Sequence, residues 1–310
     1  MAEVAGTAAR RVDPRGVALA AFGAIAFSGK AIIVKLGYRY GVDAVTLLGL
    51  RMLVALPLFV LMAMWAARRA PRLSAGDRVQ VAVLGFFGYY LSSYLDFAGL
   101  QHVSATLERL ILYLSPTLVL LIGVLFQHKR PARLQVAALA LSYLGVLLAF
   151  GHDLGAGGGE IALGSALVFA SALSYAVYLV LSGRIVARVG AVRLTAYAST
   201  VACVLCIGQY LWLKPASTLP ALPAPVWGLS LLNGTVCTVL PVLAVMLAVA
   251  RIGPALAAQV GMIGPMSTIV LSLWLLGEPM GAWQVAGTVL VMLGVFAVTR
   301  PPRAAAARGG

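Results

Sequence analysis

Apolar residues recur along almost the whole 310-residue chain in long runs, separated by short stretches rich in Arg, Pro and Gly. A transmembrane helix needs roughly 20 predominantly apolar residues to cross the hydrocarbon core of a bilayer. The pattern therefore predicts ten membrane-spanning helices joined by short connections. They cover residues 17–37, 44–66, 79–98, 104–126, 134–151, 160–183, 193–213, 225–248, 254–276 and 281–299.

The composition agrees with this pattern. Hydrophobic residues make up 62% of the chain and charged residues only 10%, whereas a soluble domain has about 25% charged residues. The sequence thus predicts an all-α integral membrane protein. Residues 1–16 form a basic N-terminal segment, and we expect residues 300–310 to be a disordered basic tail.

The net charge of +14 raises nucleic acid as a partner, but the positions of the charges favour another explanation. Most Lys and Arg residues fall in segments that lie on the same side of the membrane as the N-terminus in the predicted topology. Only Lys35, Arg39 and Lys214 fall on the opposite side. Cytoplasmic loops carry such an excess of positive charge. We therefore expect both termini on the cytoplasmic side of a bacterial-type inner membrane. The basic segments should contact anionic lipid, and we expect no nucleic-acid binding.

The two halves of the chain resemble each other. Residues 135–146 and 284–295 both begin with Gln-Val-Ala and end with Leu-Gly-Val, at an offset of 149 residues. The same offset aligns Pro116 with Pro265, and Lys129 with Glu278. The sequence therefore predicts two five-helix repeats, residues 17–151 and 160–299. Because five is odd, the second repeat must be inverted in the membrane relative to the first.

Inverted repeats with matching helix breaks are typical of secondary transporters. The matched breaks are Ser115–Pro116 and Gly264–Pro265. Proline removes a backbone donor and frees a carbonyl one turn earlier, and in hydrocarbon that carbonyl needs another partner. We expect both breaks to face protein or a water-filled cavity and to take part in gating, the alternative being inert packing kinks.

Several stretches resemble the EamA-type branch of the drug/metabolite transporter superfamily. They are Arg-Met-Leu-Val-Ala at 51–55, the two proline-containing spans, Leu-Leu-Gly-Glu-Pro at 275–279 and the two Gln-Val-Ala…Leu-Gly-Val stretches. The resemblance covers nearly the whole chain. It implies ten helices, gradient-driven transport and a central cavity. The chain departs from the family pattern at residues 27–30 and 127–130, and family members carry very different solutes.

Five ionisable residues lie in or near the predicted spans: Lys30, Arg51, Asp96, Glu108 and Arg109. Ionisable groups within the membrane are rare and usually functional. Lys30 is too deep to reach the interface, so we expect it to face a cavity and to meet a carboxylate or phosphate. For Arg51 the alternatives are a structural ion pair and a lipid-headgroup anchor, and we favour the structural role.

The adjacent charges of Glu108 and Arg109 permit two interpretations. They are either an interface pair that reaches outward and ties two spans together, or an outer gate or proton site on the cavity. Neighbouring helical residues point about 100° apart, so we predict that Arg109 pairs with Asp96 and leaves Glu108 free to take a proton.

The remaining candidates are neutral. Tyr90 and Tyr94 are four residues apart and should share a helix face, where they would hydrogen-bond a solute or belong to an interfacial belt. The other candidates for the substrate path are Tyr113, Ser115, Asn233 and Gln259.

Other functional classes fit less well. The histidines at 102, 128 and 152 have no metal-ligand spacing, so we predict neither metal nor cofactor, and no enzyme activity. The prediction is a secondary transporter, more specifically an exporter, that moves a small solute by means of a proton gradient or exchange. A flippase for lipid or polyprenyl-linked substrates is the main alternative, followed by a membrane-embedded enzyme, and a homodimer is compatible with the sequence.

Overall fold

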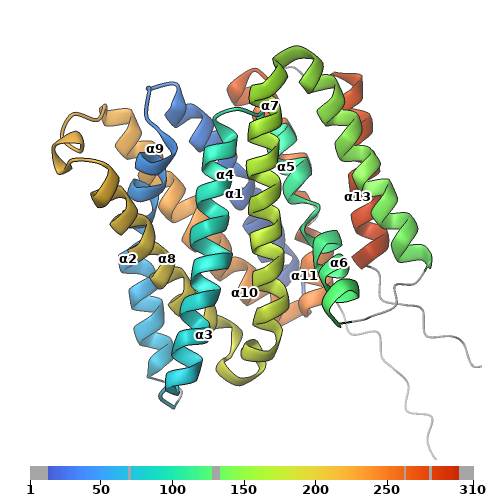
Figure 1. Ribbon diagram of the computed structural model, residues 1–310. Helices are drawn as coiled ribbons and strands as arrows, with labels where there is room; N and C mark the ends of the chain where they lie inside the picture. Colours follow the sequence, from blue (N-terminus) through green and yellow to red (C-terminus); the bar gives the residue numbers. More distant parts are fainter. Residues whose placement is uncertain (1–12, 69–70, 128–132, 262, 279–280, 300–310) are drawn as a thin grey trace, which may run out of the picture.

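The computed structural model describes residues 13–68, 71–127, 133–261, 263–278 and 281–299 (Figure 1). Within these ranges the regular structure is helical and contains no strand. The α-helices are α1 (Pro14–Tyr38), α2 (Ala44–Ala67), α3 (Ala75–Gly85), α4 (Ser92–Leu100), α5 (Ala105–Leu112), α6 (Ser115–Gln127), α7 (Arg133–Val189), α8 (Ala191–Leu213), α9 (Ala224–Gly234), α10 (Leu240–Ile252), α11 (Pro254–Gly261), α12 (Ile263–Leu271) and α13 (Ala282–Thr299).

Seven helical segments of the described chain are long and apolar enough to cross a membrane. They are Pro14–Tyr38, Ala44–Ala67, Ala75–Leu100, Ala105–Phe126, Gly158–Gly183, Ala191–Leu213 and Ala224–Ile252. Three shorter apolar helices, Leu139–Ala149, Ile263–Leu276 and Ala282–Gly294, fall at the other predicted spans. The predicted all-α, multi-pass architecture is therefore present, while the crossing of all ten segments stays a prediction.

Polar side chains mark where several of these helices begin. Asp13, Asp43, Ser74 and Ser104 each accept a hydrogen bond from a backbone N–H in the first turn of α1, α2, α3 and α5, respectively. Such N-caps satisfy donors that the helix itself leaves unpaired. They place the starts of these four segments within a few residues of the apolar runs in the sequence.

The predicted loop at 151–160 is wrong for most of its length. The chain remains helical through this stretch, and only Gly158, with φ of 58° and ψ of −137°, departs from helical geometry within α7. A positive φ is readily adopted by glycine, which lacks a Cβ. The two arms of α7 therefore run in opposite directions from a sharp corner at Gly158 (Figure 1).

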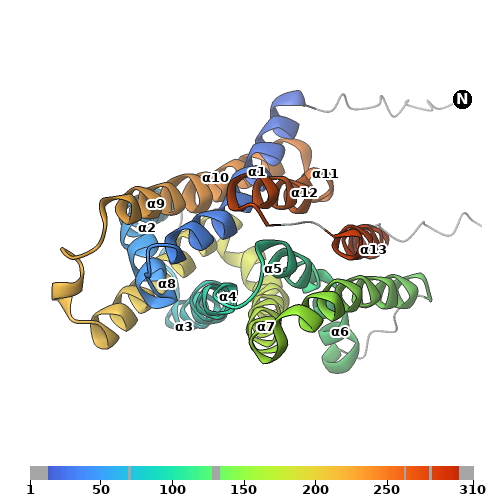
Figure 2. The ribbon, with the colours of Figure 1, turned by 90° about the horizontal axis from the view of Figure 1, so that it is seen from above.

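Close helix packing joins the last described helix of the chain to a helix from its middle. The first arm of α7 lies along α13 at one side of the bundle (Figures 1 and 2). A Cβ added at Gly287 of α13 would lie 2.5 Å from the carbonyl oxygen of Gly145 of α7. Small residues allow membrane helices to approach this closely, so these glycines account for the α7–α13 contact.

Three spans contain a π-helical turn. These are η1 (Phe86–Leu91), between α3 and α4, η3 (Thr235–Val239), between α9 and α10, and η4 (Ser272–Leu276), after α12. A π-turn adds a residue to the helical ladder and occurs often at functional sites. It also changes which residues share a face beyond it.

Candidate functional site

A cavity of about 430 Å³ lies inside the bundle and is lined by seven of its spans. The polar and charged residues of its wall are Lys30, Arg51, Tyr89, Ser92, Ser93, Asp96, Arg109, Tyr113, Ser115, Ser171, Tyr175, Ser199 and Thr238. Its apolar residues include Phe27, Met52, Phe59 and Leu112. A cavity of this size, with an apolar wall and a few convergent polar groups, is typical of small-molecule sites.

Four charged side chains meet at one end of this cavity. The ammonium of Lys30 on α1 bonds to Asp96 on α4, and its Nζ lies 3.3 Å from Oε1 of Glu108 on α5. Arg109 Nε lies 3.8 Å from Glu108 Oε2. We call Lys30, Asp96, Glu108 and Arg109 the charge cluster. Two cations and two carboxylates balance formally, which lowers the high cost of burying each one alone.

The charge cluster is buried. The exposed fraction is 0% for Glu108, 2% for Asp96 and 5% for both Lys30 and Arg109. An interface pair that reaches outward would expose its charged ends, so this burial argues against the interface interpretation of Glu108 and Arg109. The predicted pairing of Arg109 with Asp96 is wrong: Asp96 pairs with Lys30, and Arg109 lies next to Glu108.

Several buried polar atoms of the charge cluster have no hydrogen-bond partner within the described chain. They are Asp96 Oδ1, both carboxylate oxygens of Glu108, and Nε and Nη2 of Arg109. Buried polar groups are normally hydrogen-bonded. The carboxylate oxygens can therefore accept hydrogen bonds from a solute or water or take up a proton, and the Arg109 nitrogens can donate to a solute or water.

Aromatic rings complete this end of the cavity. The ring centre of Phe27 lies 5.5 Å from Lys30 Nζ and 5.8 Å from the guanidinium carbon of Arg109. A cation within about 6 Å of a ring is attracted to its electron-rich face. Phe27, which was not among the residues predicted for the site, thus supports both cations from the cavity side.

Arg51 is a cavity residue that the sequence analysis assigned differently. Its exposed fraction is 5%, its Nε donates to Thr238 at 2.8 Å, and its guanidinium lies 5.2 Å from the ring centre of Phe97. Its Nη1 has no hydrogen-bond partner among the described residues. This placement excludes a headgroup anchor, because the side chain does not reach the surface, and among the described residues Arg51 forms a hydrogen bond in place of the expected ion pair.

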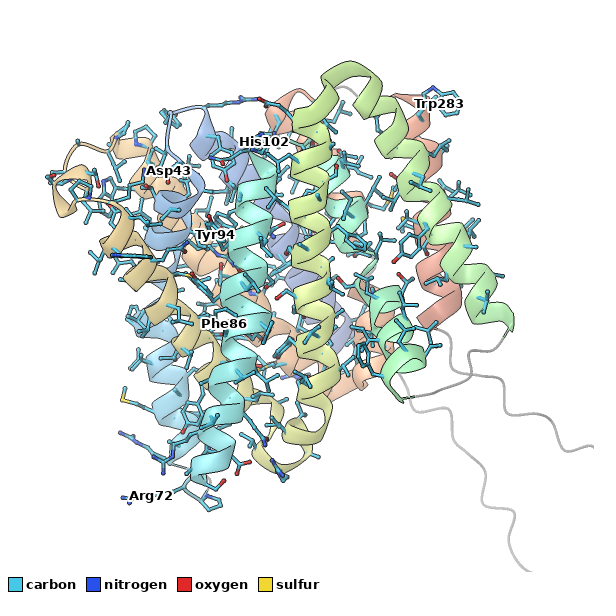
Figure 3. The ribbon with its side chains drawn as sticks, in the orientation of Figure 1. Asp43, Arg72, Phe86, Tyr94, His102 and Trp283 are labelled. Carbon is cyan, nitrogen blue, oxygen red and sulfur yellow. The ribbon has the colours of Figure 1, made fainter. Side chains whose placement is uncertain are left out.

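The tyrosines occupy other positions than the sequence pattern suggested. Tyr89 and Tyr175 line the cavity. Tyr90 and Tyr94 are absent from its wall and pack in part against the buried core of α1, α2 and α8, and Figure 3 marks the position of Tyr94. The sequence argument assumed α-helical spacing. The π-helical turn at 86–91 changes that spacing and turns Tyr89 toward the cavity.

The remaining neutral candidates are spread over the bundle. Tyr113 and Ser115 line the cavity. Asn233 is buried with an exposed fraction of 3%, and its backbone carbonyl accepts the hydroxyl of Thr238. Gln259 belongs to α11, but its side chain lies outside the described part of the structure.

One of the two aligned prolines follows a break in a span. Helix α5 ends at Leu112 and α6 starts at Ser115, just before Pro116, whereas Gly264 and Pro265 lie inside α12 and residue 262 before it is outside the described residues. The carbonyl of Leu112, freed by Pro116, accepts the hydroxyl of Ser115 at 2.6 Å. The break before Pro116 is therefore packed within protein, as expected for irregular backbone at membrane depth.

The segment around Pro265 is tied to the first half of the chain. The carbonyl of Gly261, freed by Pro265, lies 3.5 Å from the hydroxyl of Tyr113. The carbonyl of Gly264 accepts the hydroxyl of Ser28 at 2.7 Å. Pro116 contributes to the cavity wall, whereas Gly264 and Pro265 lie outside it.

Hydrogen bonds between the two halves of the chain join the helices at the end of the bundle near residues 35–44 and 100–105. Both carboxylate oxygens of Glu278 accept from the N–H of Ala105, at 3.1 and 3.2 Å, and Ser272 donates to the same carboxylate. Arg39 Nη2 donates to the carbonyl of Leu276 at 2.6 Å. An acidic side chain at the start of a helix also interacts favourably with the helix dipole.

Metal binding finds no support in the described residues. No group of three or more His, Cys, Asp or Glu side chains comes together there. The four charged groups of the cluster are instead arranged as ion pairs, an arrangement that suits binding of an organic ion or a proton.

Comparison with known proteins identifies the family. The model of the EamA-like transporter family matches residues 14–151 and 162–300. The chain is 33% identical to "Uncharacterized transporter YcbK" of Bacillus subtilis over 86% of each chain, and 26% identical to "Uncharacterized transporter YyaM" of the same organism over 71% of this chain and 72% of that one.

A solved crystal structure has the same fold. It superposes with a TM-score of 0.62 at 17% sequence identity, covering 91% of this chain and 95% of the other. At this identity the likeness concerns the fold alone. The two family matches together cover nearly the whole chain, and the protein belongs to the EamA-like transporter family.

Proposed function

We propose that this protein is a secondary active transporter that exports a small solute across the bacterial inner membrane by alternating access. Ten spans cross the membrane, arranged as two inverted five-helix repeats with both termini in the cytoplasm. Membership of the transporter family and the transporter relatives support transport as the function. The charge cluster at one end of a cavity within the bundle is the observation that carries the proposed mechanism.

The solute binds in the cavity between the charge cluster and Arg51. Both Arg51 and Arg109 line the cavity and have guanidinium nitrogens without a hydrogen-bond partner among the described residues. Phe27, Phe59, Tyr89 and other aromatic side chains supply apolar contact. The site would thus hold a compact solute with one charged or polar group and an apolar part.

The charge cluster provides a means of coupling proton uptake to solute binding. Glu108 contacts both Lys30 and Arg109, so a proton on Glu108 removes the negative charge that holds these two cations in place. The cations then become available to a solute or to water. Proton uptake by Glu108 therefore changes the affinity of the cluster for a solute, which is the linkage that coupling of transport to a proton gradient requires.

Hydrogen bonds join the helices at the end that the charge pattern assigns to the outside. Glu278, Arg39 and Lys35 hold this end through hydrogen bonds to backbone groups of other helices. Opening of this end requires these few bonds to break, while the break before Pro116 and the proline within α12 allow the half-helices to tilt. Movement of the halves about a fixed central site is the usual basis of alternating access.

Thermal unfolding of the purified protein in detergent tests this proposal and identifies the solute class. The panel consists of amino acids, sugar phosphates, nucleosides and cationic drugs. A ligand at 100 times its dissociation constant stabilises the folded state by about 2.7 kcal/mol. We expect stabilisation by one class only, and loss of it in Arg51→Gln. Absence of stabilisation by every soluble compound would contradict a small-solute site and favour a lipid-like substrate.

A further inference from the structure

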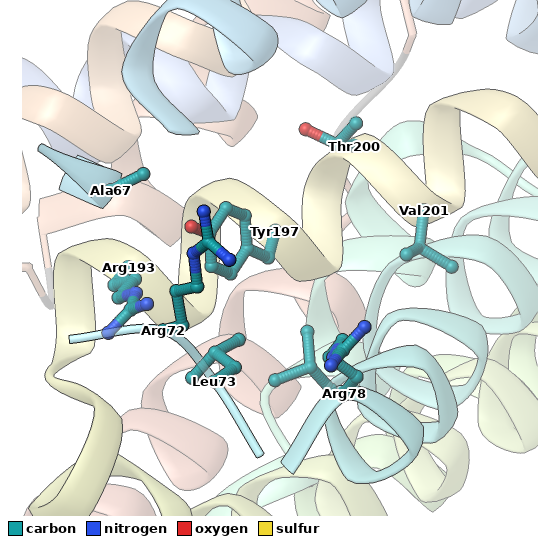
Figure 4. A pocket seen from close by; sticks show the side chains of 9 residues that line it. Ala67, Arg72, Leu73, Arg78, Arg193, Tyr197, Thr200 and Val201 are labelled. Atoms are coloured by element: carbon teal, nitrogen blue, oxygen red, sulfur yellow. The ribbon is translucent and has the colours of Figure 1, made fainter. Parts of the chain in front are cut away.

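A second pocket, of about 630 Å³, lies at the end of the bundle opposite to residues 35–44 and 100–105. At this end α2 ends and α3 and α8 begin (Figure 4). It is lined by Ala67, Arg72, Leu73, Arg78, Val81, Arg193, Tyr197, Thr200 and Val201. We call it the arginine pocket. Three of these residues are arginines and none is acidic, so the pocket concentrates positive charge on a largely apolar wall.

The arginine pocket is separate from the transport cavity. Successive residues of an α-helix are turned by about 100°. Tyr197, Thr200 and Val201 therefore share one side of α8, while Ser199 and Ala202, which line the cavity, lie on the opposite side. The pocket thus occupies the face of α8 that points away from the centre of the bundle.

The face of α8 above the arginine pocket is apolar and exposed. Val204 lies on the same side of α8 as Tyr197 and has an exposed fraction of 57%. On a membrane-spanning helix, exposed apolar side chains face the acyl chains of lipids. The arginine pocket therefore lies where a lipid-facing surface meets the end of the bundle.

Arg193 forms the buried base of the pocket. Its exposed fraction is 8%, its Nη2 donates to the carbonyl of Pro71 at 2.6 Å, and its guanidinium lies 5.6 Å from the ring centre of Tyr197. Its Nε is buried and has no hydrogen-bond partner in the described chain. A buried, charged donor of this kind needs an acceptor.

The neighbouring carboxylate does not supply that acceptor. Asp77 lies beside Arg78 in the chain, but its Oδ1 accepts from Arg188 at 2.8 Å and its Oδ2 from Ser74. Arg72, between α2 and α3, and Arg78, in the first turn of α3, are exposed at the mouth of the pocket (Figure 4). The positive charge of the three arginines is thus free to meet a ligand.

We propose that the arginine pocket binds the phosphate-bearing headgroup of an anionic phospholipid. Arg193 holds the phosphate from below, Arg72 and Arg78 hold it at the mouth, and the acyl chains run along α8 past Val204. Guanidinium groups match the geometry of phosphate oxygens. Basic pockets between membrane helices bind anionic headgroups in this way, and the adjoining apolar face favours a lipid over a soluble anion.

Native mass spectrometry of the intact protein tests the proposal with defined probes. The protein is released from detergent micelles that contain dioleoylphosphatidylglycerol or dioleoylphosphatidylcholine, with and without inorganic phosphate. We expect preferential retention of phosphatidylglycerol. The double variant Arg72→Gln/Arg78→Gln should weaken its retention by roughly 30-fold, from the usual attraction of each basic side chain to anionic lipid.

Two further variants sharpen the test. Arg15→Gln removes a cation at the same end of the bundle but outside the pocket, and should retain phosphatidylglycerol as the wild type does. Arg193→Lys keeps the charge but loses the fork of donors, and should weaken retention by several-fold. Equal loss in Arg15→Gln, or no loss in the double variant, would overturn the proposal. Displacement of the lipid by millimolar phosphate would also overturn it, in favour of a soluble anion.

Discussion

Oε1 of Glu108 lies 3.3 Å from Nζ of Lys30, and neither side chain is accessible to solvent beyond a few per cent. One residue comes from α1 and the other from α5, so this contact joins the two helices at one end of the cavity. Since Lys30 also bonds to Asp96, a single ammonium neutralises two buried carboxylates. The predictions below follow from this arrangement and from the packing around it.

Removal of the Lys30 charge should destabilise the protein strongly. In Lys30→Met, Asp96 and Glu108 lose their shared partner, and an uncompensated buried charge costs about 3–5 kcal/mol. The free energy of unfolding in detergent, measured by chemical denaturation, should fall by this amount. The double variant Lys30→Met/Asp96→Asn removes one cation and one anion together and should recover at least half of the loss. Equal stability of the single and double variants would contradict the ion-pair account.

Pro116 should govern local opening of the cavity wall. Pro116→Ala restores an N–H that can bond the carbonyl of Leu112, which now accepts from Ser115. A hydrogen bond contributes about 1 kcal/mol, so hydrogen exchange around residues 113–117 should slow by roughly five-fold and transport should slow with it.

A matched control for this prediction is Pro57→Ala. Pro57 also lies inside a helix, α2, but on an exposed face and away from the cavity wall. Its replacement should leave exchange around residues 113–117 and transport unchanged. If Pro116→Ala behaved like Pro57→Ala in both measurements, Pro116 would be a packing kink without a role in gating.

The α7–α13 contact should depend on Gly287. An added Cβ would lie 2.5 Å from a backbone oxygen of Gly145, so the helices would have to move apart. Overpacking of this kind costs about 1–3 kcal/mol, and Gly287→Ala should lower the free energy of unfolding accordingly. By contrast, Gly183→Ala adds a Cβ to helix α7 with no atom within 4 Å and should stabilise by about 0.5–1 kcal/mol. The same sign of change in both variants would contradict the packing argument.

Asp43, which precedes α2, should make stability sensitive to acid. Partial burial raises the pKa of its carboxyl, but hydrogen bonds from Lys214 and Thr46 outweigh this effect and hold the pKa below its usual value. A carboxyl with a depressed pKa contributes stability above its unfolded pKa of about 3.9, and this contribution is lost as the pH falls through the folded value.

Thermal unfolding between pH 3 and pH 7 measures this dependence. Asp43→Asn should lose less stability than the wild type at the acid end of the range. Lys214→Met should show the same reduced loss of stability at low pH, because the Lys214 ammonium that it removes lies 2.5 Å from Asp43 Oδ2. An unchanged acid slope in Asp43→Asn would show that other carboxyls dominate.

Much of the fold could be predicted from the sequence because the membrane imposes one length on every span. Apolar runs and flanking charges located the helices to within a few residues for most spans. The corner at 151–160 was not predictable in this way, because a glycine-rich stretch is compatible with both a loop and a helix that bends at one residue. Only the φ of Gly158 distinguishes the two.

The site could be predicted in part. Charges within or beside apolar runs identified Lys30, Asp96, Glu108 and Arg109, since burial of a charge is costly unless the charge has a partner. Their pairing depends on the relative rotation of α1, α4 and α5, which periodicity does not provide. Tyr89 was missed because the π-helical turn changes the helical phase, and a π-turn has no reliable signature in a single sequence.

The most direct test of the central claim compares transport by wild type and Glu108→Gln in proteoliposomes loaded with a solute that stabilises the protein. The account predicts that Glu108→Gln loses transport driven by a pH gradient but keeps solute exchange. Glu160→Gln, the same change at a side chain that is 81% exposed, should retain both activities. Full gradient-driven transport by Glu108→Gln would exclude Glu108 as the coupling group and contradict the proposed role of the charge cluster.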